Sequence, residues 1–160
     1  MFFSGGQPKV LLMRFTRLLL LTVLVVFLTS SIAQALQLVS VSRSRVNMRT
    51  GPGKNYAVLW ELGLGYPLRV LGSKGNWLKV ADFEGDTGWI YKKLVSKKPH
   101  LIVKKKQINI RKKPGTRNVI VGKAKYGVVL QTVKRGKGWV KVRHQNGLTG
   151  WVKRDLLWGW

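Results

Sequence analysis

The sequence VNMRTGPG at residues 46–53 recurs in altered form as INIRKKPG at residues 108–115. The two stretches lie 62 residues apart (108 − 46 = 62), and the same offset continues downstream without a gap. It aligns WLKV (77–80) with WVKV (139–142), and GDTGW (85–89) with GLTGW (147–151). A match that fixes Asn, Pro, Gly and Trp together indicates two copies of one unit. Two copies form a tandem pair rather than a solenoid, which needs three or more repeats.

Each copy contains short runs that alternate apolar and polar residues, separated by glycine-rich turns. In the first copy we expect extended segments at 38–42, 47–49, 56–62, 66–71, 76–82 and 87–91, with turns at 50–53, 72–75 and 83–86. The last turn of the second copy contains Asn146-Gly147, a strong hairpin signal. This pattern predicts an all-β chain of two small tandem barrels.

Alternation along the expected strands predicts which side chains face inward. Gly88 is expected where two strands cross closely, because it has no side chain to keep them apart. We expect the first core to contain Met48, Val58, Leu68, Val70, Leu78, Val80, Ile90 and Leu94.

The N-terminal part of the chain has the three regions of a secretory signal peptide. A basic segment at 13–17 precedes an apolar run at 18–28, and Ala33-Gln34-Ala35 predicts cleavage after Ala35. The apolar run is shorter than the roughly 20 residues that span a bilayer. An uncleaved anchor is the alternative, and Met13 is an alternative start. We therefore expect a signal peptide at 1–35, barrels at 36–95 and 100–160, a linker at 96–99, and an exported periplasmic or extracellular protein.

The charge of the chain is strongly unbalanced, with a net charge of +25 and only five acidic residues. Loss of Lys9, Arg14 and Arg17 with the signal peptide would leave 25 − 3 = +22. Residues 100–157 hold 16 Lys and Arg against one acid. This imbalance favours an anionic partner, and in an exported chain an envelope polymer or lipid is favoured over nucleic acid.

Few residues offer catalytic or metal-binding chemistry. There is no cysteine, and neither His100 nor His144 has a carboxylate neighbour in the sequence. Asp82, Glu84 and Asp86 surround one turn. We expect that turn to be solvated, with a bound cation as the alternative, although the EF-hand pattern is absent. The sequence thus predicts a protein that is not an enzyme and has no catalytic residues, resident metal or cofactor.

Three motifs present in both copies carry a family resemblance: N-x-R-x-x-P-G, W-x-K-V and G-x-T-G-W-[IV]. They resemble the bacterial SH3-like (SH3b) domain family, and the ending DLLWG (155–159) is similar to that of its exported tandem members. The resemblance implies barrels of five or six strands without catalytic chemistry. It also implies a targeting role, in which such barrels bind peptidoglycan or envelope proteins.

Positions that differ between the copies are free to carry function. The first copy has rings where the second has none, and these are our candidates for ligand stacking: Tyr56, Trp60, Tyr66, Phe83 and Tyr91. The second copy has cations where the first has small, polar or acidic residues, and these are our candidates for polyanion binding: Lys112, Lys113, Arg117, Lys123, Lys125 and Arg143. We expect the rings to be partly exposed; packing of the rings between the barrels is the alternative.

These patterns together predict a non-catalytic exported module that binds a wall or envelope component such as peptidoglycan. The first barrel would bind cell-wall glycan or peptide by stacking, and the second would hold an anionic envelope polymer. One alternative is a polyanion binder for lipopolysaccharide, teichoic acid, anionic lipid or nucleic acid, which includes binding to a membrane surface. Another is an adaptor for an envelope protein or enzyme.

Overall fold

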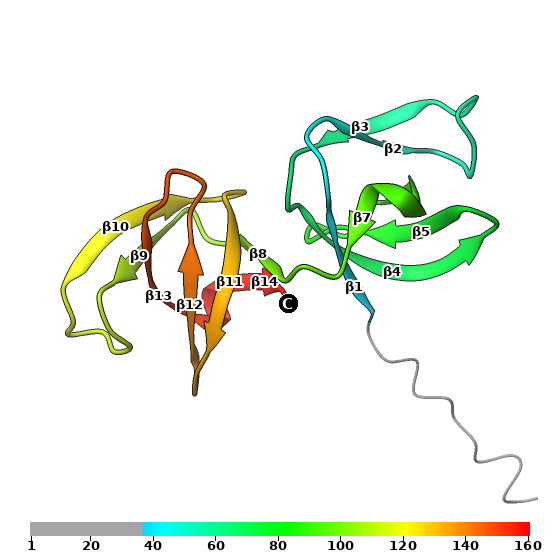
Figure 1. Ribbon diagram of the computed structural model, residues 1–160. Coiled ribbons are helices and arrows are strands. Elements are labelled where there is room, and N and C mark those ends of the chain that lie inside the picture. The colour runs from blue at the N-terminus through cyan, green and yellow to red at the C-terminus, as the bar shows by residue number, and fades with distance from the viewer. Residues whose placement is uncertain (1–36) are drawn as a thin grey trace, which may run out of the picture. The chain divides into compact units, whose positions relative to one another are not determined.

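A computed structural model describes residues 37–160 of the chain, which lie within one compact unit. The expected signal peptide and its cleavage site fall outside the described residues. The described part contains two seven-stranded antiparallel sheets (Figure 1). The predicted fold class of two tandem SH3-like barrels is confirmed.

Barrel 1 and barrel 2 contain the same elements in the same order. The strands of barrel 1 are β1 (Leu38–Val41), β2 (Val46–Arg49), β3 (Val58–Leu62), β4 (Pro67–Lys74), β5 (Trp77–Ala81), β6 (Thr87–Tyr91) and β7 (Val95–Ser96). Those of barrel 2 are β8 (His100–Val103), β9 (Gln107–Arg111), β10 (Ile120–Lys125), β11 (Val129–Arg135), β12 (Trp139–Arg143), β13 (Thr149–Lys153) and β14 (Leu157–Gly159).

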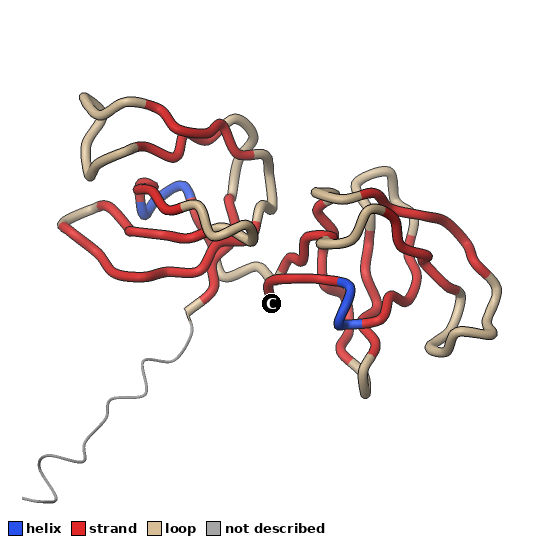
Figure 2. Tube along the Cα trace, turned by 180° about the vertical axis from the view of Figure 1, so that it is seen from behind, coloured by secondary structure: helices blue, strands red, loops and turns tan. Residues whose placement is uncertain are grey.

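Helical structure in the described residues is limited to two single 3-10 turns, η1 (Lys92–Leu94) and η2 (Arg154–Leu156), one before the last strand of each barrel (Figure 2). Within residues 37–160, no helix has both the length and the apolar character needed to cross a membrane.

The strand order is also repeated. Barrel 1 is ordered β3-β2-β6-β5-β4-β1-β7, and barrel 2 is ordered β10-β9-β13-β12-β11-β8-β14. In each barrel the last strand pairs with the first, since Ser40 lies opposite Ser96 and Ile102 lies opposite Trp158. The β2–β3 and β9–β10 hairpins each place an edge strand, β3 or β10, at the other end of the order.

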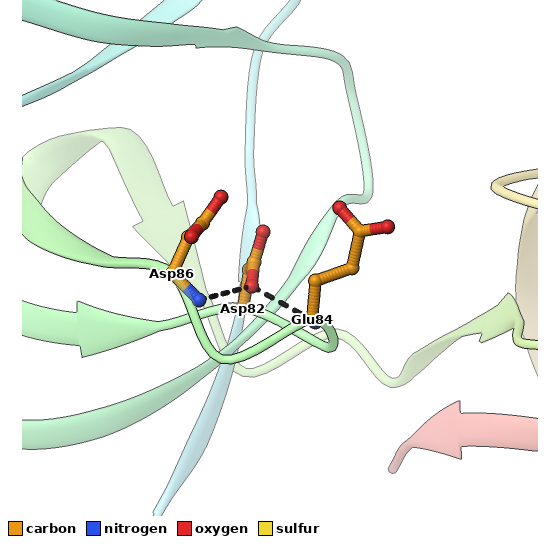
Figure 3. A group of neighbouring side chains, drawn as sticks. All are labelled: Asp82, Glu84 and Asp86. Atoms are coloured by element: carbon orange, nitrogen blue, oxygen red, sulfur yellow. Dashed lines mark hydrogen bonds between the residues drawn. The ribbon is translucent and has the colours of Figure 1, made fainter.

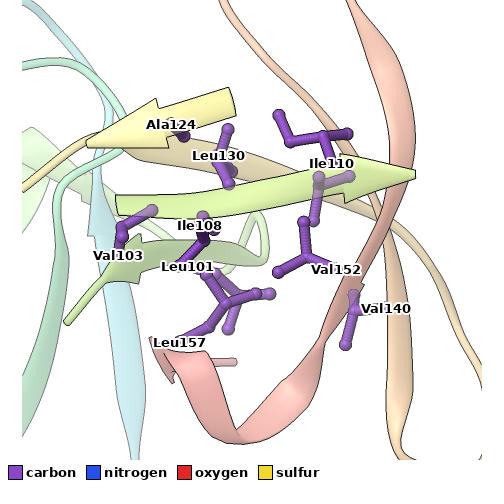
Figure 4. Packing of buried hydrophobic residues seen from close by; sticks show 10 residues of the cluster. Leu101, Val103, Ile108, Ile110, Ala124, Leu130, Val140, Val152 and Leu157 are labelled. Carbon is purple, nitrogen blue, oxygen red and sulfur yellow. The ribbon is translucent and has the colours of Figure 1, made fainter. Parts of the chain in front are cut away.

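Each barrel encloses its own apolar core. In barrel 2, side chains from seven strands converge on one cluster, of which Figure 4 labels nine members: Leu101, Val103, Ile108, Ile110, Ala124, Leu130, Val140, Val152 and Leu157. Barrel 1 has the corresponding cluster around Met48, Leu68 and Ile90, all fully buried. Of the expected core residues, Val80 is also buried, and Val70, Leu78 and Leu94 pack against this cluster.

The expectation that Val58 is a core residue is wrong, because its side chain is 48% exposed. The register of β2 against β3 shifts at this point, so that Arg49 pairs with Val58 but Met48 pairs with Trp60. This bulge inserts one residue and breaks the alternation on which the prediction depended. As a result, four consecutive residues of β3 are exposed, and Leu62 contributes to the core instead.

A second correction concerns the expected turn at 72–75. Strand β4 continues through Lys74, and the chain reverses over Gly75 and Asn76 alone. Gly75 has a φ of 53°, a conformation that glycine adopts readily and that two-residue hairpins require. A register shift between Val70 and Gly72 absorbs the additional strand residues.

The close strand crossing expected at Gly88 is present and recurs in barrel 2. A Cβ atom at Gly88 would lie 2.6 Å from Cγ of Met48 and 3.0 Å from the carbonyl oxygen of Arg49. At Gly150, the same atom would lie 2.6 Å from Cγ2 of Ile110 and 2.8 Å from the oxygen of Arg111. These glycines allow β6 and β13 to cross β2 and β9 closely.

Candidate functional site

The β2–β3 and β9–β10 hairpins are built on the same loop. In barrel 1, Nη1 of Arg49 donates to the carbonyl oxygen of Tyr56 at 2.8 Å. In barrel 2, Nη1 of Arg111 donates to the carbonyl oxygen of Asn118 at 2.7 Å. These arginines stand at equivalent positions of the repeat, so their role in shaping the loop is common to both barrels. The side chains that the loop displays differ.

Two of the predicted stacking rings are exposed on the β2–β3 hairpin. Tyr56 is 43% exposed and Trp60 is 52% exposed. The ring of Tyr56 lies against Gly51, where a Cβ atom would collide with it, and it also lies close to Gly53. These two rings are therefore carried by the same hairpin but are not enclosed by it.

A third ring, Tyr91, lies in a groove that the sequence did not predict. Its ring packs edge-on against Trp77, with ring centroids 5.5 Å apart and planes at 61°. Both rings line a hollow of about 260 Å³ on barrel 1 together with Val46 and Leu94. Four cationic side chains line the same hollow: Arg43, Arg45, Arg49 and Lys54. We call this hollow the aromatic–cationic groove.

Arg45 stands at the corner between β1 and β2 with a φ of 58°, an unusual conformation for a residue with a side chain. Its Nε donates to Oε1 of Glu61 at 3.2 Å. Both side chains of this ion pair are more than half exposed, so water screens it and it contributes little to stability. Arg45 therefore retains the ability to contact an anion at the groove.

The remaining two predicted rings lie together, away from this groove's lining. Tyr66 and Phe83 are half-buried, with ring centroids 6.2 Å apart. The hydroxyl of Tyr66 donates to Oδ2 of Asp82 at 3.3 Å, and burial, with the nearby Asp82 charge, raises the pKa of Tyr66 well above its usual range. Phe83 also packs against Tyr126, 5.3 Å away. For Phe83, packing between the barrels therefore accounts for part of its burial.

The acidic turn is solvated at Glu84 and Asp86, as expected, but Asp82 is only 5% exposed. Its Oδ1 accepts hydrogen bonds from the backbone N–H groups of Glu84 and Asp86 (Figure 3) and from that of Gly85, each at 2.9 Å. Oxygens of the three carboxylates lie within 4.8 Å of one another. Because Oδ1 of Asp82 already accepts three donors, its position is explained by holding the turn.

The predicted polyanion-binding residues of barrel 2 are all exposed. Lys112, Lys113 and Arg117 lie in the loop of the β9–β10 hairpin, and Lys123 and Lys125 follow on β10. Arg143 ends β12. The hairpin thus brings five of the six residues onto two connected segments.

Sequence reasoning missed the cations of the groove because they come from separate segments. Arg43 and Arg45 belong to the β1–β2 corner, and Lys54 belongs to the β2–β3 loop. Two features of the sequence could have drawn attention to them: the Arg-x-Arg spacing at 43–45, and the ring of Tyr91, which is Lys153 in the other copy.

The chain is similar in sequence to part of a larger bacterial protein. The chain is 24% identical over 139 residues to "Putative N-acetylmuramoyl-L-alanine amidase YrvJ" of Bacillus subtilis (strain 168), covering 80% of this chain. It spans only 27% of the length of that relative.

Two solved structures with similarity are NlpC1 from Trichomonas vaginalis and the endolysin LysPBC5 CBD. NlpC1 is 16% identical with a TM-score of 0.33, over 80% of this chain and 47% of NlpC1. The LysPBC5 CBD is 16% identical with a TM-score of 0.30, over 81% of this chain and 97% of the other.

The family described as "Bacterial SH3 domain" matches the chain twice, at residues 42–97 and 104–159. The two matches follow the two barrels and cover more than half of the chain. The resemblance drawn from the repeated motifs is confirmed, and the chain belongs to the bacterial SH3 domain family.

Proposed function

We propose that this chain is an exported, non-catalytic module that binds peptidoglycan through barrel 1. Membership of the bacterial SH3 domain family supports a binding role. The relative named as an amidase acts, by that name, on an N-acetylmuramoyl-L-alanine bond, which is a bond of the cell wall. The proposal includes the predicted division into residues 36–95 and 100–160 with a linker at 96–99.

The observation that carries this proposal is the aromatic–cationic groove. Trp77 and Tyr91 offer apolar ring surface, and Arg43, Arg45 and Lys54 offer charge. Rings of this kind stack on sugars and small apolar side chains, and guanidinium groups form paired hydrogen bonds with carboxylates. Peptidoglycan presents both chemistries, since its glycan carries peptides that bear carboxylates. At about 260 Å³ the groove is slightly smaller than common ligand pockets, which suits a short segment of such a polymer.

A non-catalytic role agrees with the partners of the two histidines. Nδ1 of His100 lies 3.1 Å from the carbonyl oxygen of Lys98. Nδ1 of His144 lies 2.7 Å from Oδ1 of Asn146 and stabilises the turn at that point. Both rings have structural partners that account for their positions.

Binding to purified cell-wall sacculi across a salt series tests the proposal. Tyr91→Ala should weaken binding roughly fivefold, at about 1 kcal/mol for a lost ring contact, without changing the salt slope. Tyr56→Ala with Trp60→Ala should also weaken binding if the exposed hairpin rings extend the site. The matched control is Lys153→Ala, at the equivalent position of barrel 2, which should leave the salt-independent part of binding unchanged. A protein that does not bind sacculi, or a Tyr91→Ala variant that binds like wild type, would contradict the proposal.

We also propose that the cations of barrel 2 bind an anionic partner: Lys112, Lys113, Arg117, Lys123, Lys125 and Arg143. Their exposure and the near absence of acids in this half support it. Binding by such residues releases counterions and therefore weakens steeply as salt rises.

A further inference from the structure

The β9–β10 hairpin exposes apolar side chains directly beside its cations. Val119 is 68% exposed, Ile120 is 43% exposed and Val121 is 38% exposed. A register shift between Ile120 and Gly122 breaks the alternation of β10, so consecutive side chains face solvent. These three adjacent aliphatic residues, at the end of the loop and the start of an edge strand, form an exposed patch of the kind that marks an interaction surface.

This hairpin loop is held in place by its own hydrogen bonds. The N–H of Lys112 donates to the oxygen of Val119 at 2.9 Å, and the N–H of Asn118 donates to the oxygen of Gly115 at 3.3 Å. Nδ2 of Asn118 donates to the oxygen of Pro114 at 2.8 Å. Together with the Arg111 contact, these bonds fix where the loop presents its side chains. The exposure of Val119 is therefore a property of an ordered loop.

Cations flank the apolar patch on both sides in the sequence. Lys112, Lys113 and Arg117 precede it within the loop. Lys123 and Lys125 follow it on β10 and are exposed on either side of the buried Ala124. The patch and the cations therefore lie on one hairpin, which we call the amphipathic hairpin (residues 112–125, the loop that follows β9 together with β10 in Figure 1).

We propose that the amphipathic hairpin docks on the surface of an anionic lipid bilayer. Lipid phosphates would meet the lysines and Arg117, while Val119 and Ile120 would enter the boundary between headgroups and acyl chains. Peripheral binding of this kind combines buried apolar area with electrostatic attraction. A soluble anionic polymer would use the cations but would leave the aliphatic side chains in water, so a bilayer accounts for both features.

This inference deepens the anion-binding role proposed for barrel 2 and does not depend on peptidoglycan binding by barrel 1. The equivalent hairpin of barrel 1 has Thr50, Gly51 and Asn55 at the positions of Lys112, Lys113 and Arg117. It also exposes Val58 and Leu59, but without the cation cluster. Barrel 1 thus supplies a control with a similar apolar edge and much less charge.

The experiment measures co-sedimentation of the Leu36–Trp160 chain with vesicles of phosphatidylcholine alone or containing phosphatidylglycerol. This chain is the expected mature form and corresponds to one compact unit. We expect binding only to the anionic vesicles. Lys112→Ala, Lys113→Ala and Arg117→Ala together should weaken it on the order of 100-fold, at about fivefold per cation.

The decisive variant is Val119→Ser with Ile120→Ser, whose matched control is Ala57→Ser with Val58→Ser in barrel 1. The first should weaken vesicle binding roughly tenfold through lost apolar contact, and the control should bind like wild type. Binding of both variants to soluble long-chain polyphosphate should match wild type, and near-ultraviolet circular dichroism should show that both are folded.

Three results would overturn the inference. The first is vesicle binding that Val119→Ser with Ile120→Ser leaves unchanged, which would indicate a polymer site. The second is equal loss in the barrel 1 control. The third is lipid-independent self-association that the same double variant abolishes, which would assign the edge to a second copy of this chain. Sacculus binding, measured separately, tests the peptidoglycan proposal and should not change in Val119→Ser with Ile120→Ser.

Discussion

The β2–β3 and β9–β10 hairpins compare two surfaces built on one scaffold. Both have an arginine that donates to a loop carbonyl, and both have a register shift at the same repeat position. On this common backbone, barrel 1 displays Tyr56 and Trp60, while barrel 2 displays lysines and Arg117. Residues that match between the copies therefore build the loop, and residues that differ define its surface chemistry.

The last hairpin turns give a similar contrast. In barrel 1, one buried carboxylate oxygen of Asp82 binds three backbone N–H groups. In barrel 2, the equivalent residue is His144, whose Nδ1 lies 2.7 Å from Oδ1 of Asn146, and this oxygen also accepts from the N–H of Leu148 at 3.1 Å. The turn that Asp82 alone holds in barrel 1 is thus held by two side chains, His144 and Asn146, in barrel 2.

The largest loss of stability should follow from adding a methyl group at the close strand crossing, and it tests the scaffold that the two barrels share. Gly150→Ala places Cβ against the β-branched Ile110 and a backbone oxygen, whereas Gly88→Ala meets mainly the flexible Met48 side chain. Overpacking costs about 1–3 kcal/mol, and we expect Gly150→Ala to be near or above the upper end and Gly88→Ala near the lower. Thermal unfolding followed by NMR, which reports each barrel separately, measures this. Equal losses, or a larger loss for Gly88→Ala, would show that the two crossings are not as different as their contacts indicate.

A smaller effect should separate the two turns. Asp82→Ala removes the acceptor of three backbone donors and should destabilise barrel 1 by about 2 kcal/mol. His144→Ala should cost less, because Asn146 continues to hold its turn. Urea denaturation of both variants, compared with wild type, provides the measurement. Equal losses of unfolding free energy in the two variants would show that the turn of barrel 2 depends on His144 as strongly as the turn of barrel 1 depends on Asp82.

The smallest expected effect is a pH dependence that belongs to one histidine. Burial lowers the pKa of His100 below its ordinary value of 6.5, so in the folded protein it takes up a proton less readily than in the unfolded chain. Stability is therefore greatest above about pH 6.5 and falls as the pH decreases through that value toward the folded pKa. The free energy of unfolding at pH 7 and pH 5 should differ in wild type and in His144→Gln. In His100→Gln the difference should become smaller; an unchanged difference would assign the pH dependence to another group.

The repeated motifs were sufficient to predict the fold class, because the 62-residue offset fixed equivalent positions without a gap. The close strand crossing at Gly88 could be predicted from the place of this glycine in the closing motif. The exposure of Val58 could not be predicted, because a bulge changes which face a residue occupies and nothing in the sequence of β3 indicates the bulge. The turn at 72–75 was misplaced for a similar reason, since a register shift lets β4 extend to Lys74.

The candidate site was only partly predictable. Differences between the copies singled out Tyr56 and Trp60, which are exposed. They did not reveal that Tyr91 packs against Trp77, because Trp77 and its equivalent Trp139 are the same residue type and a comparison of the copies does not single them out. The cations of the groove meet the rings only after β1, β2, β5 and β6 have come together, which depends on the path of the chain and not on local spacing. Asp82 was misassigned because an acid in a turn is commonly solvated, and its three backbone partners become evident only in the folded loop.

The pairing of each barrel's last strand with its first has a consequence for how such chains can grow. Because β7 lies beside β1 and β14 lies beside β8, the chain leaves each barrel next to the strand by which it entered. Gene duplication can therefore add a whole barrel at this point without rethreading the existing one. The same property makes each barrel suitable for transplantation: a designer could append a third copy, or exchange one, and alter the ligand by rewriting a single hairpin.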